Sequence, residues 1–245
     1  MAEKFYKKVK LNVADVYPNK QISAAAMLRV MNDTAYWQLD AQKPSCEDLM
    51  SRGKTLLLNN IDLQFTGEAG IADELTVYAW LCAPTGFTYP RCYEAYLGDK
   101  LVAKASAKWV LVDIKERKLL SPFDEDISGC YIGDWFDAVS AKRLRIPSQI
   151  NDEMQKIGFH KVSLSNCDYN GHMNNVQSLI MLCDYIPELS DGTAGVDHVR
   201  LHFLNEAPLD DELTVNMCKK DGTYSFRTVK ADGRTNIEAE IVLKY

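Results

Sequence analysis

Two stretches of the chain have the spacing of apolar residues that is typical of buried helices. Residues 22–37 are apolar on nearly every side, including an unbroken run from Ala24 to Leu28. A helix that is hydrophobic all round is buried rather than laid on a surface. Residues 176–186 repeat apolar positions at helical spacing, and a helix there should end before Pro187. The pattern therefore predicts two central helices, one in each part of the chain.

Other stretches alternate between apolar and polar residues, as half-buried strands do. Residues 103–109 and 237–243 have this alternation, and each follows a Gly-Asp or Asp-Gly pair that is typical of a hairpin turn. Residues 9–15 and 162–168 resemble each other and precede the two helices. Each half of the chain is thus predicted to contain a strand, a helix and then a run of antiparallel strands.

An internal repeat supports this division. Residues 61–77 and 199–215 align without a gap and are identical at nine of 17 positions. A repeat of this kind marks a structural unit that occurs twice. We therefore expect an α+β fold in which each half is a central helix wrapped by an antiparallel sheet. The predicted boundaries are 1–123 for the N-terminal half, 124–157 for a connector and 158–245 for the C-terminal half.

Composition narrows the class of protein. The 245 residues carry a net charge of −6 and are 47% hydrophobic, which is ordinary for a globular protein and too acidic for a typical nucleic-acid binder. No stretch approaches the roughly 20 apolar residues that span a bilayer. Because the charged N-terminus is also unlike a signal peptide, we expect a cytoplasmic protein without membrane insertion.

Cysteine usage and the lack of known binding motifs argue against bound groups. Seven scattered cysteines without a C-x-x-C motif favour free thiols over disulfides or a zinc site. The sequence has no P-loop and no dinucleotide fingerprint. We therefore expect neither a metal nor a cofactor.

Candidate chemistry gathers in one motif before the second helix. Asp168, Asn170, His172, Asn174 and Asn175 follow the pattern D-x-N-x-H-x-N-N. Asp and Asn at a helix entrance are common as turn and cap residues. A His in the same motif is harder to explain by turn geometry, because the whole chain has only four. The His shifts the interpretation toward a functional site.

The repeat offers an internal comparison for this motif. Aligning Asp168 with Asp15 leaves Asn170 and His172 without an identical counterpart in the first half. Turn-forming duties should be the same in both halves, so the Asp is expected to be structural in each. The Asn and the His are then specific to the second half, and they are the better candidates for a functional role.

The D-x-N-x-H-x-N-N motif, inside a two-fold repeat of this length, resembles the plant-type and bacterial acyl-acyl-carrier-protein (acyl-ACP) thioesterase family. The resemblance covers essentially the whole chain. It implies a tandem double hotdog fold and hydrolysis of fatty acyl-ACP to free fatty acid and ACP, which terminates fatty acid synthesis. Asp168, Asn170 and His172 fall on the family's catalytic Asp, Asn and His, and Glu206 falls on its catalytic Glu. Plant members have a Cys after that Glu, whereas this chain has Ala207, so water or a carboxylate remains as the nucleophile.

One active site per chain is expected. Glu68 occupies the place of Glu206 in the repeat but lacks the accompanying His, so a structural role is expected for it. The resemblance implies that the first half shapes a pocket for the acyl chain. Met27, Met31 and Trp37 are the candidate wall residues, although core packing is the better explanation for any one of them.

The resemblance further implies residues that contact the substrate and its carrier. Asn174 and Asn175 are candidate substrate-binding residues at the second helix. ACP is acidic, so a basic docking patch is expected. Lys142, Arg143 and Arg145 in the connector are the best candidate cluster, and Lys115, Arg117 and Lys118 in a turn are a second. Either a monomer or a homodimer would fit, because the repeat supplies within one chain the pairing that single hotdogs achieve by dimerising.

Three other functions fit the same residues. A hotdog hydrolase acting on acyl-coenzyme A (acyl-CoA) would cleave the same bond, and a comparison of the two thioesters would separate it from an acyl-ACP enzyme. A non-catalytic acyl-chain binder would be expected to lose one of the motif residues. A dehydratase would convert hydroxyacyl thioesters without releasing a thiol.

Overall fold

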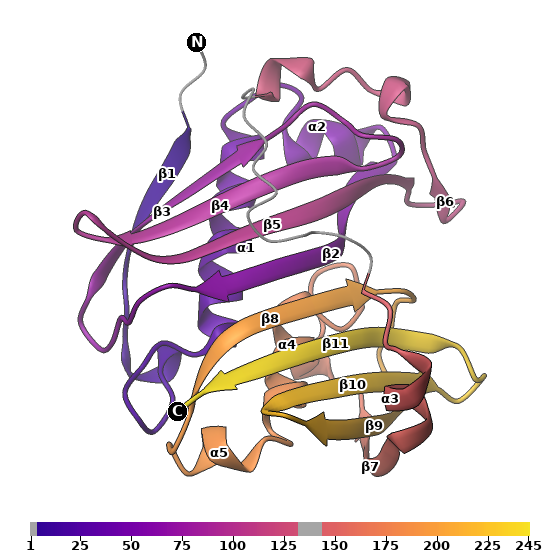
Figure 1. Ribbon diagram of the computed structural model, residues 1–245. Helices are drawn as coiled ribbons and strands as arrows, with labels where there is room; N and C mark the ends of the chain where they lie inside the picture. The colour runs from indigo at the N-terminus through magenta and orange to yellow at the C-terminus, as the bar shows by residue number, and fades with distance from the viewer. Residues whose placement is uncertain (1–3, 132–143) are drawn as a thin grey trace.

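The computed structural model describes residues 4–131 and 144–245. Its strands form one sheet of 11, in the order β1-β3-β4-β5-β2-β8-β11-β10-β9-β7 with β6 paired to β5, and neighbouring strands are antiparallel (Figure 1). The first half contains β1 (Phe5–Lys10), β2 (Lys54–Phe65), β3 (Glu74–Leu81), β4 (Tyr89–Leu97), β5 (Lys100–Asp113) and β6 (Lys118–Leu119). The second half contains β7 (Gln155–Lys161), β8 (Gly195–Phe203), β9 (Glu212–Lys220), β10 (Thr223–Lys230) and β11 (Thr235–Lys244). The strand order of the second half mirrors that of the first, as the repeat predicts.

Two central helices, α1 (Ala24–Asp40) and α4 (Asn175–Cys183), lie on the same face of the sheet (Figure 1). Each begins at a residue whose side chain accepts a backbone N–H of the first turn, which satisfies a donor that the helix leaves free: Ser23 for α1 and Asn174 for α4. Both helices confirm the predicted ones. Three short helices complete the set: α2 (Cys46–Ser51), α3 (Ser148–Glu153) and α5 (Pro187–Ser190).

The predicted strands over 9–15 and 162–168 are wrong beyond the ends of β1 and β7. Residues 13–15 and 164–166 form 3₁₀ turns instead. In each turn, the side chain of the third residue accepts the backbone N–H of the residue before the turn. This local hydrogen bond competes with strand pairing and turns the chain toward the central helix.

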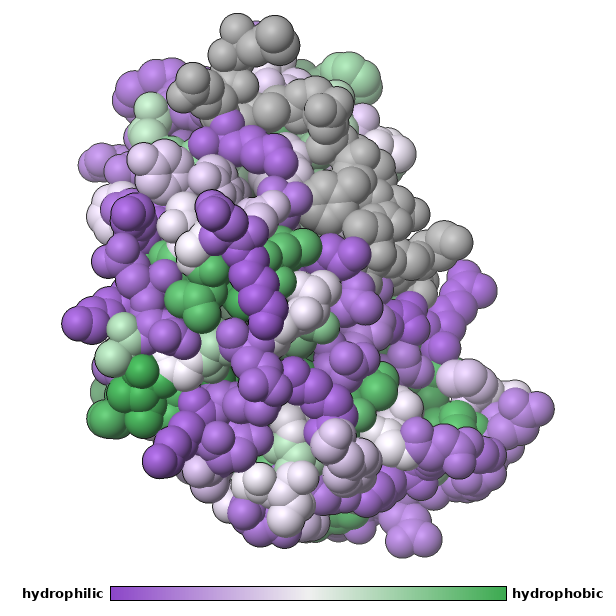
Figure 2. Space-filling view, turned by 60° about the vertical axis from the view of Figure 1, so that its left-hand side comes forward, coloured by the Kyte–Doolittle hydropathy of each residue, from purple (hydrophilic) through white to green (hydrophobic). Residues whose placement is uncertain are grey.

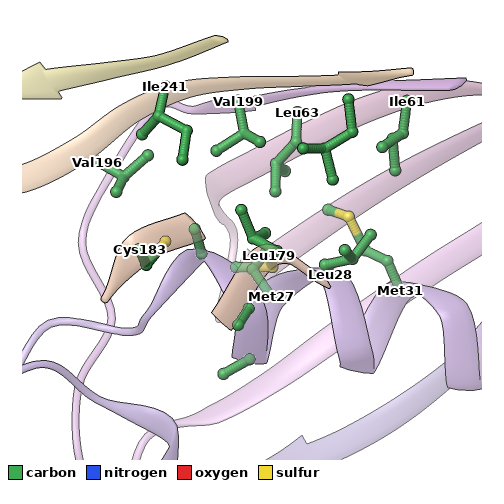
Figure 3. Close-up of a cluster of buried hydrophobic side chains, with 14 of the residues drawn as sticks. Met27, Leu28, Met31, Ile61, Leu63, Leu179, Cys183, Val196, Val199 and Ile241 are labelled. Atoms are coloured by element: carbon green, nitrogen blue, oxygen red, sulfur yellow. The ribbon is translucent and has the colours of Figure 1, made fainter. Parts of the chain in front are cut away.

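One hydrophobic core crosses the boundary between the halves. In Figure 3, side chains from α1 and α4 point toward the underside of β2 and β8. The buried members of this core include Met27, Leu28, Met31, Leu63, Leu179 and Val199. Fully burying one such side chain stabilises the fold by about 1.5–3 kcal/mol, so the two halves stabilise each other.

The seam between β2 and β8 also carries a buried charge cluster. Asp62 of β2 lies directly opposite Arg200 of β8 in the ladder, and its carboxylate is buried. It accepts from the ring of His198 and lies 3.6 Å from Arg200 Nε, while Arg200 Nη1 contacts Glu240 Oε2 at 2.8 Å. Because a buried carboxylate is costly unless it is paired, the cluster fixes the register in which the halves join.

The face drawn in Figure 2 is largely hydrophilic, with apolar side chains gathered in a few separate patches. None of the helices in the described part of the chain is long and apolar enough to cross a membrane.

Leu63→Ala should lower the free energy of unfolding of the whole chain by about 2–5 kcal/mol, because it leaves a cavity in the shared core. Leu63 is 1% exposed and lies on β2 beside the seam. Urea unfolding followed by circular dichroism measures the change. Leu119→Ala, at a residue that is 51% exposed, is the control and should change it by less than about 0.5 kcal/mol. Two separate transitions in the Leu63 variant would argue against a single core.

Candidate active site

The motif before α4 is folded into a tight turn. Asp168 Oδ1 accepts the backbone N–H of Asn170 at 2.8 Å, and its own N–H donates to the carbonyl of His172 at 3.0 Å. Gly171 has φ +76°, a left-handed conformation that glycine adopts without a Cβ penalty. Asp168 therefore shapes the turn that carries Asn170 and His172.

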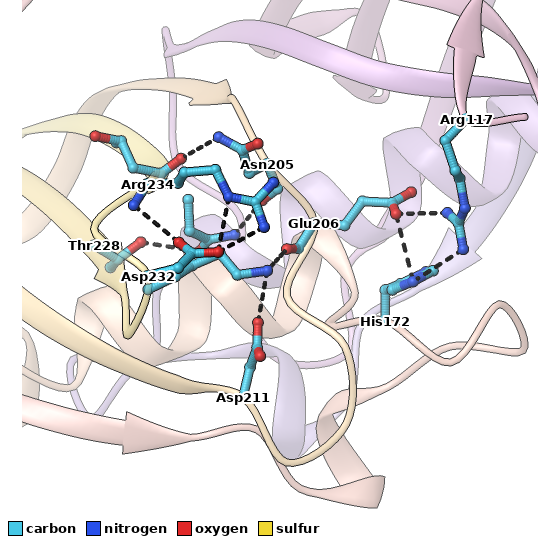
Figure 4. Close-up of polar contacts among 11 residues, drawn as sticks. Arg117, His172, Asn205, Glu206, Asp211, Thr228, Asp232 and Arg234 are labelled. Carbon is cyan, nitrogen blue, oxygen red and sulfur yellow. Dashed lines mark hydrogen bonds and ion pairs between the residues drawn. The ribbon is translucent and has the colours of Figure 1, made fainter.

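A second loop of the same half brings Glu206 to this turn. The backbone N–H of Met173 donates to the carbonyl of Ala207 at 2.8 Å, and His172 forms an isolated β-bridge with Pro208. These bonds place Glu206 Oε2 3.4 Å from His172 Nε2 (Figure 4). The side chain of His172 is 17% exposed and that of Glu206 is 39% exposed, so the pair can be reached from solvent.

The third member of the cluster comes from the first half. Arg117, in the turn between β5 and β6, donates from Nη1 to Glu206 Oε2 at 2.5 Å, and its Nη2 lies 3.4 Å from His172 Nε2 (Figure 4). The backbone carbonyl of Glu206 accepts from Lys230 Nζ at 2.8 Å. Sequence reasoning missed this role of Arg117, since no spacing along the chain links two residues that are 89 positions apart.

A cavity of about 1060 Å³ adjoins this cluster. From the first half it is lined mainly by apolar side chains of α1, α2, β2 and β5, and from the second half by the two loops and the start of α4. The predicted site residues on its lining are Asp168, Asn170, His172, Asn174, Asn175 and Glu206. Its size suits a drug-sized or larger apolar ligand. The residues of the sequence motif and residues of the first half thus line one cavity between the two halves.

The predicted pocket-wall residues of α1 lie elsewhere. Met27 and Met31 are fully buried in the shared core and are absent from the cavity lining. Trp37 is 46% exposed, lies under the amine of Lys7 and is also absent from the lining. Tyr36, the residue before Trp37, does line the cavity. Apolar periodicity cannot separate a side chain that packs in a core from one that borders a hollow.

Only one residue of the predicted docking cluster lies among the described residues. Lys142 and Arg143 lie outside the described residues, and Arg145 is exposed on the segment that leads into α3.

Backbone geometry corrects the alignment of the two halves in this region by two residues. The equivalent 3₁₀ turns end at Asp15 and Asn166, so Asp168 has no Asp partner in the first half. The bridges from Gln21 to Gly70 and from His172 to Pro208 are equivalent, which makes Gln21 the counterpart of His172.

This correction changes which residues are specific to the second half. The Asn is common to both halves, because Asn19 now matches Asn170, whereas the Asp and the His are specific. The interpretation that Asp15 and Asp168 share one structural duty was therefore wrong. Asp15 instead closes its 3₁₀ turn and contacts Arg29 Nη2 at 2.6 Å.

The cysteines near the site are poor nucleophiles. Cys46 lines the cavity, and burial raises the pKa of its thiol from 9.0 to about 11. Burial likewise raises the pKa of Cys183, in α4, to about 12. Cys167 donates its S–H to the carbonyl of Ser163 at 3.4 Å, and Ala207 follows Glu206. Because the thiolate is the reactive form, burial makes Cys46 and Cys183 weak candidates for a nucleophile.

The arrangement can activate water. A carboxylate beside an imidazole can remove a proton from water and deliver one to a leaving group. Helix α4 begins at the cavity, which Asn174 and Asn175 line. A helix N-terminus carries the positive end of the helix dipole. An anion that develops on a carbonyl oxygen would be stabilised there.

Comparisons with known proteins agree with this geometry. Residues 149–244 match the family model for the acyl-ACP thioesterase C-terminal domain. An acyl-ACP thioesterase from Bacteroides thetaiotaomicron superposes with a TM-score of 0.86 at 14% identity, covering 98% of this chain and 97% of that one. The 12:0-ACP thioesterase from Umbellularia californica gives a TM-score of 0.83 at 14% identity, with 98% and 97% covered. No sequence among the curated proteins matches significantly. The predicted tandem double hotdog fold is confirmed.

Cys46 should react slowly with iodoacetamide in the folded protein. A pKa of about 11 in place of 9.0 lowers the thiolate fraction at pH 8 about 100-fold, and the rate should rise about tenfold per pH unit until the pKa is reached. Timed labelling and mass spectrometry of the Cys46 peptide measure the rate, with labelling in urea as the control. Equal rates in both conditions would contradict the buried thiol.

Proposed function

Since residues 149–244 match the family model for the acyl-ACP thioesterase C-terminal domain, we propose that this chain hydrolyses fatty acyl-ACP thioesters to free fatty acid and ACP. The observation that carries the proposal is the contact between His172 and Glu206 beside a large cavity with an apolar wall. The cavity gives room for an acyl chain, and the pair supplies proton transfer at the thioester. ACP is then the carrier of the substrate.

In the proposed mechanism, the thioester carbonyl lies at the N-terminus of α4. Glu206 takes a proton from water, and the hydroxide attacks the carbonyl carbon. Backbone N–H groups of the first turn and the side chain of Asn170 stabilise the oxyanion. The proton passes from Glu206 to His172, which lies 3.4 Å away, and as the C–S bond breaks His172 gives it to the departing thiolate, so that both groups return to their starting protonation states.

The remaining motif residues have supporting roles in this scheme. Asp168 holds the turn through its bond to the Asn170 N–H, and Asn174 caps α4 so that the helix begins at Asn175. A thiolate leaves readily, so no covalent enzyme intermediate is needed. The chain supplies a single site, because Gln21 replaces the His in the first half.

Docking of the carrier needs a basic surface, since charge complementarity guides acidic partners to their site. Arg145, with Lys142 and Arg143 beside it in the sequence, is our candidate docking cluster. Monomer and homodimer both remain compatible with a chain that contains its own pair of hotdog units. Six described cysteines are free thiols, which supports a reducing compartment such as the cytoplasm.

Glu206→Gln should lower kcat by about 10²–10⁴-fold, the usual contribution of a general base. Glu68→Gln is the matched control, because Glu68 occupies the same place in the first half and, within the described part of the chain, its carboxylate accepts a single hydrogen bond, from Gln21 at 3.1 Å. Its kcat should equal that of the wild type. Release of free thiol from acyl-ACP measures both. Wild-type turnover in the Glu206 variant would rule out the general-base role.

Acyl-ACP should be hydrolysed with a higher kcat/KM than the matching acyl-CoA, because the carrier adds contacts beyond the acyl chain. Thiol release from medium-chain and long-chain members of both series measures the ratio and the preferred chain length. A preference for acyl-CoA would indicate a CoA hydrolase. Tight acyl-chain binding without turnover would indicate a binder, and loss of water from a hydroxyacyl substrate would indicate a dehydratase.

A further inference from the structure

We infer that the first half supplies a positioning residue to the active site: the guanidinium of Arg117 holds the carboxylate of Glu206 against His172. The inference deepens the proposed function and rests on it, since it assumes that Glu206 and His172 are the reacting groups. It assigns Arg117 to the catalytic site rather than to the surface.

The geometry joins the three side chains into one triangle. Glu206 Oε2 accepts a hydrogen bond from Arg117 Nη1 at 2.5 Å and lies 3.4 Å from His172 Nε2. Arg117 Nη2 lies 3.4 Å from the same ring nitrogen. A single imidazole nitrogen cannot donate to the carboxylate and accept from the guanidinium at once. The guanidinium therefore influences both the direction of the carboxylate and the tautomer of the ring.

Glu206 has little else to orient it. Among the described residues, its carboxylate contacts only the guanidinium and the imidazole, and its side chain is 39% exposed. A half-exposed glutamate with so few contacts would sample several rotamers without Arg117. Its backbone is already fixed, since its carbonyl accepts from Lys230 Nζ at 2.8 Å. The arginine thus completes the positioning at the one part of Glu206 that remains free to rotate.

The backbone conformation of Arg117 allows a test that distinguishes a positioning role from a purely structural one. Its φ is +54°, a left-handed conformation that costs free energy for most side chains and that asparagine tolerates better. Arg117→Asn should therefore leave the melting temperature unchanged or raise it. A residue kept for stability alone would give the opposite result.

The test compares Arg117→Asn with Arg52→Asn. Arg52 also belongs to the first half, pairs with a glutamate (Glu125), and is 52% exposed against 55% for Arg117, but it does not line the cavity. Steady-state kinetics on acyl-ACP should give a kcat about tenfold to 100-fold lower for Arg117→Asn, with KM within about twofold of the wild type. Arg52→Asn should retain the wild-type kcat. Arg117→Lys should recover part of the loss, because it restores the charge without the planar fork.

A second readout is independent of turnover. The ¹⁵N chemical shifts of the His172 ring, assigned with a His172→Gln variant, should change in Arg117→Asn and stay the same in Arg52→Asn. If the wild type hydrolyses no thioester, the proposed function fails, and these shifts alone decide whether Arg117 organises the pair.

Two results would overturn the inference. One is a wild-type kcat in Arg117→Asn together with unchanged His172 shifts. The other is an unchanged kcat with a raised KM, which would make Arg117 a contact for the carrier. A lower kcat accompanied by changed His172 shifts and an intact melting temperature would support it.

Discussion

The antiparallel pairing of β2 with β8 is the constraint on which the rest of the molecule depends. It joins the six described strands of the first half and the five of the second into one continuous sheet and places both central helices on the same side. The buried carboxylate of Asp62 can be accommodated only where Arg200 and His198 face it, so a shift of one residue would leave a buried charge unpaired. With the register fixed, the β5–β6 turn of the first half lies beside the loops that carry His172 and Glu206, where Arg117 contacts both residues.

The same pairing leaves the two ends of the molecule different. At one end, the turn that carries Gln21 contacts the second half. Asn19 Nδ2 donates to the carbonyl of Ala194 at 3.0 Å, and a Cβ on Gly195 would lie 2.7 Å from Gln21 Oε1. At the other end, the equivalent corner of His172 and Glu206 opens into the cavity. The two copies of this turn therefore have different surroundings. The first contacts the other half of the chain, and the second borders the cavity.

Much of the fold could be predicted from the sequence because the repeat is strong and local. Nine identities in 17 positions carry the strand pattern, and the apolar helices have the right length. The motif at the entrance of α4 also kept its residues together, since a turn and a helix cap hold neighbours in sequence close in space. The family resemblance supplied Glu206, which the motif alone could not have included.

What the sequence did not reveal has two physical causes. Alternation looked like a strand at 9–15 and 162–168, where side chains that bond to their own backbone made a turn, and this misled the alignment of Asp168 with Asp15. Contacts between the halves produce no periodic pattern of apolar and polar residues in the sequence. In the sequence, Arg117 is recognisable only as a charged residue in a turn. Met27 and Met31 are recognisable only as apolar residues of a helix, and their neighbours depend on tertiary packing.

A site that takes one wall from each half of a single chain has a consequence for how it can change. In a symmetric homodimer of single units, every substitution is present in both subunits. It therefore changes both sites and both opposite walls at the same time. Here a substitution in the α1 or β5 wall of the cavity is present once and faces the turn of His172 once. Under the proposed function, the residues that contact the acyl chain and the residues that cleave the thioester can therefore change independently by mutation.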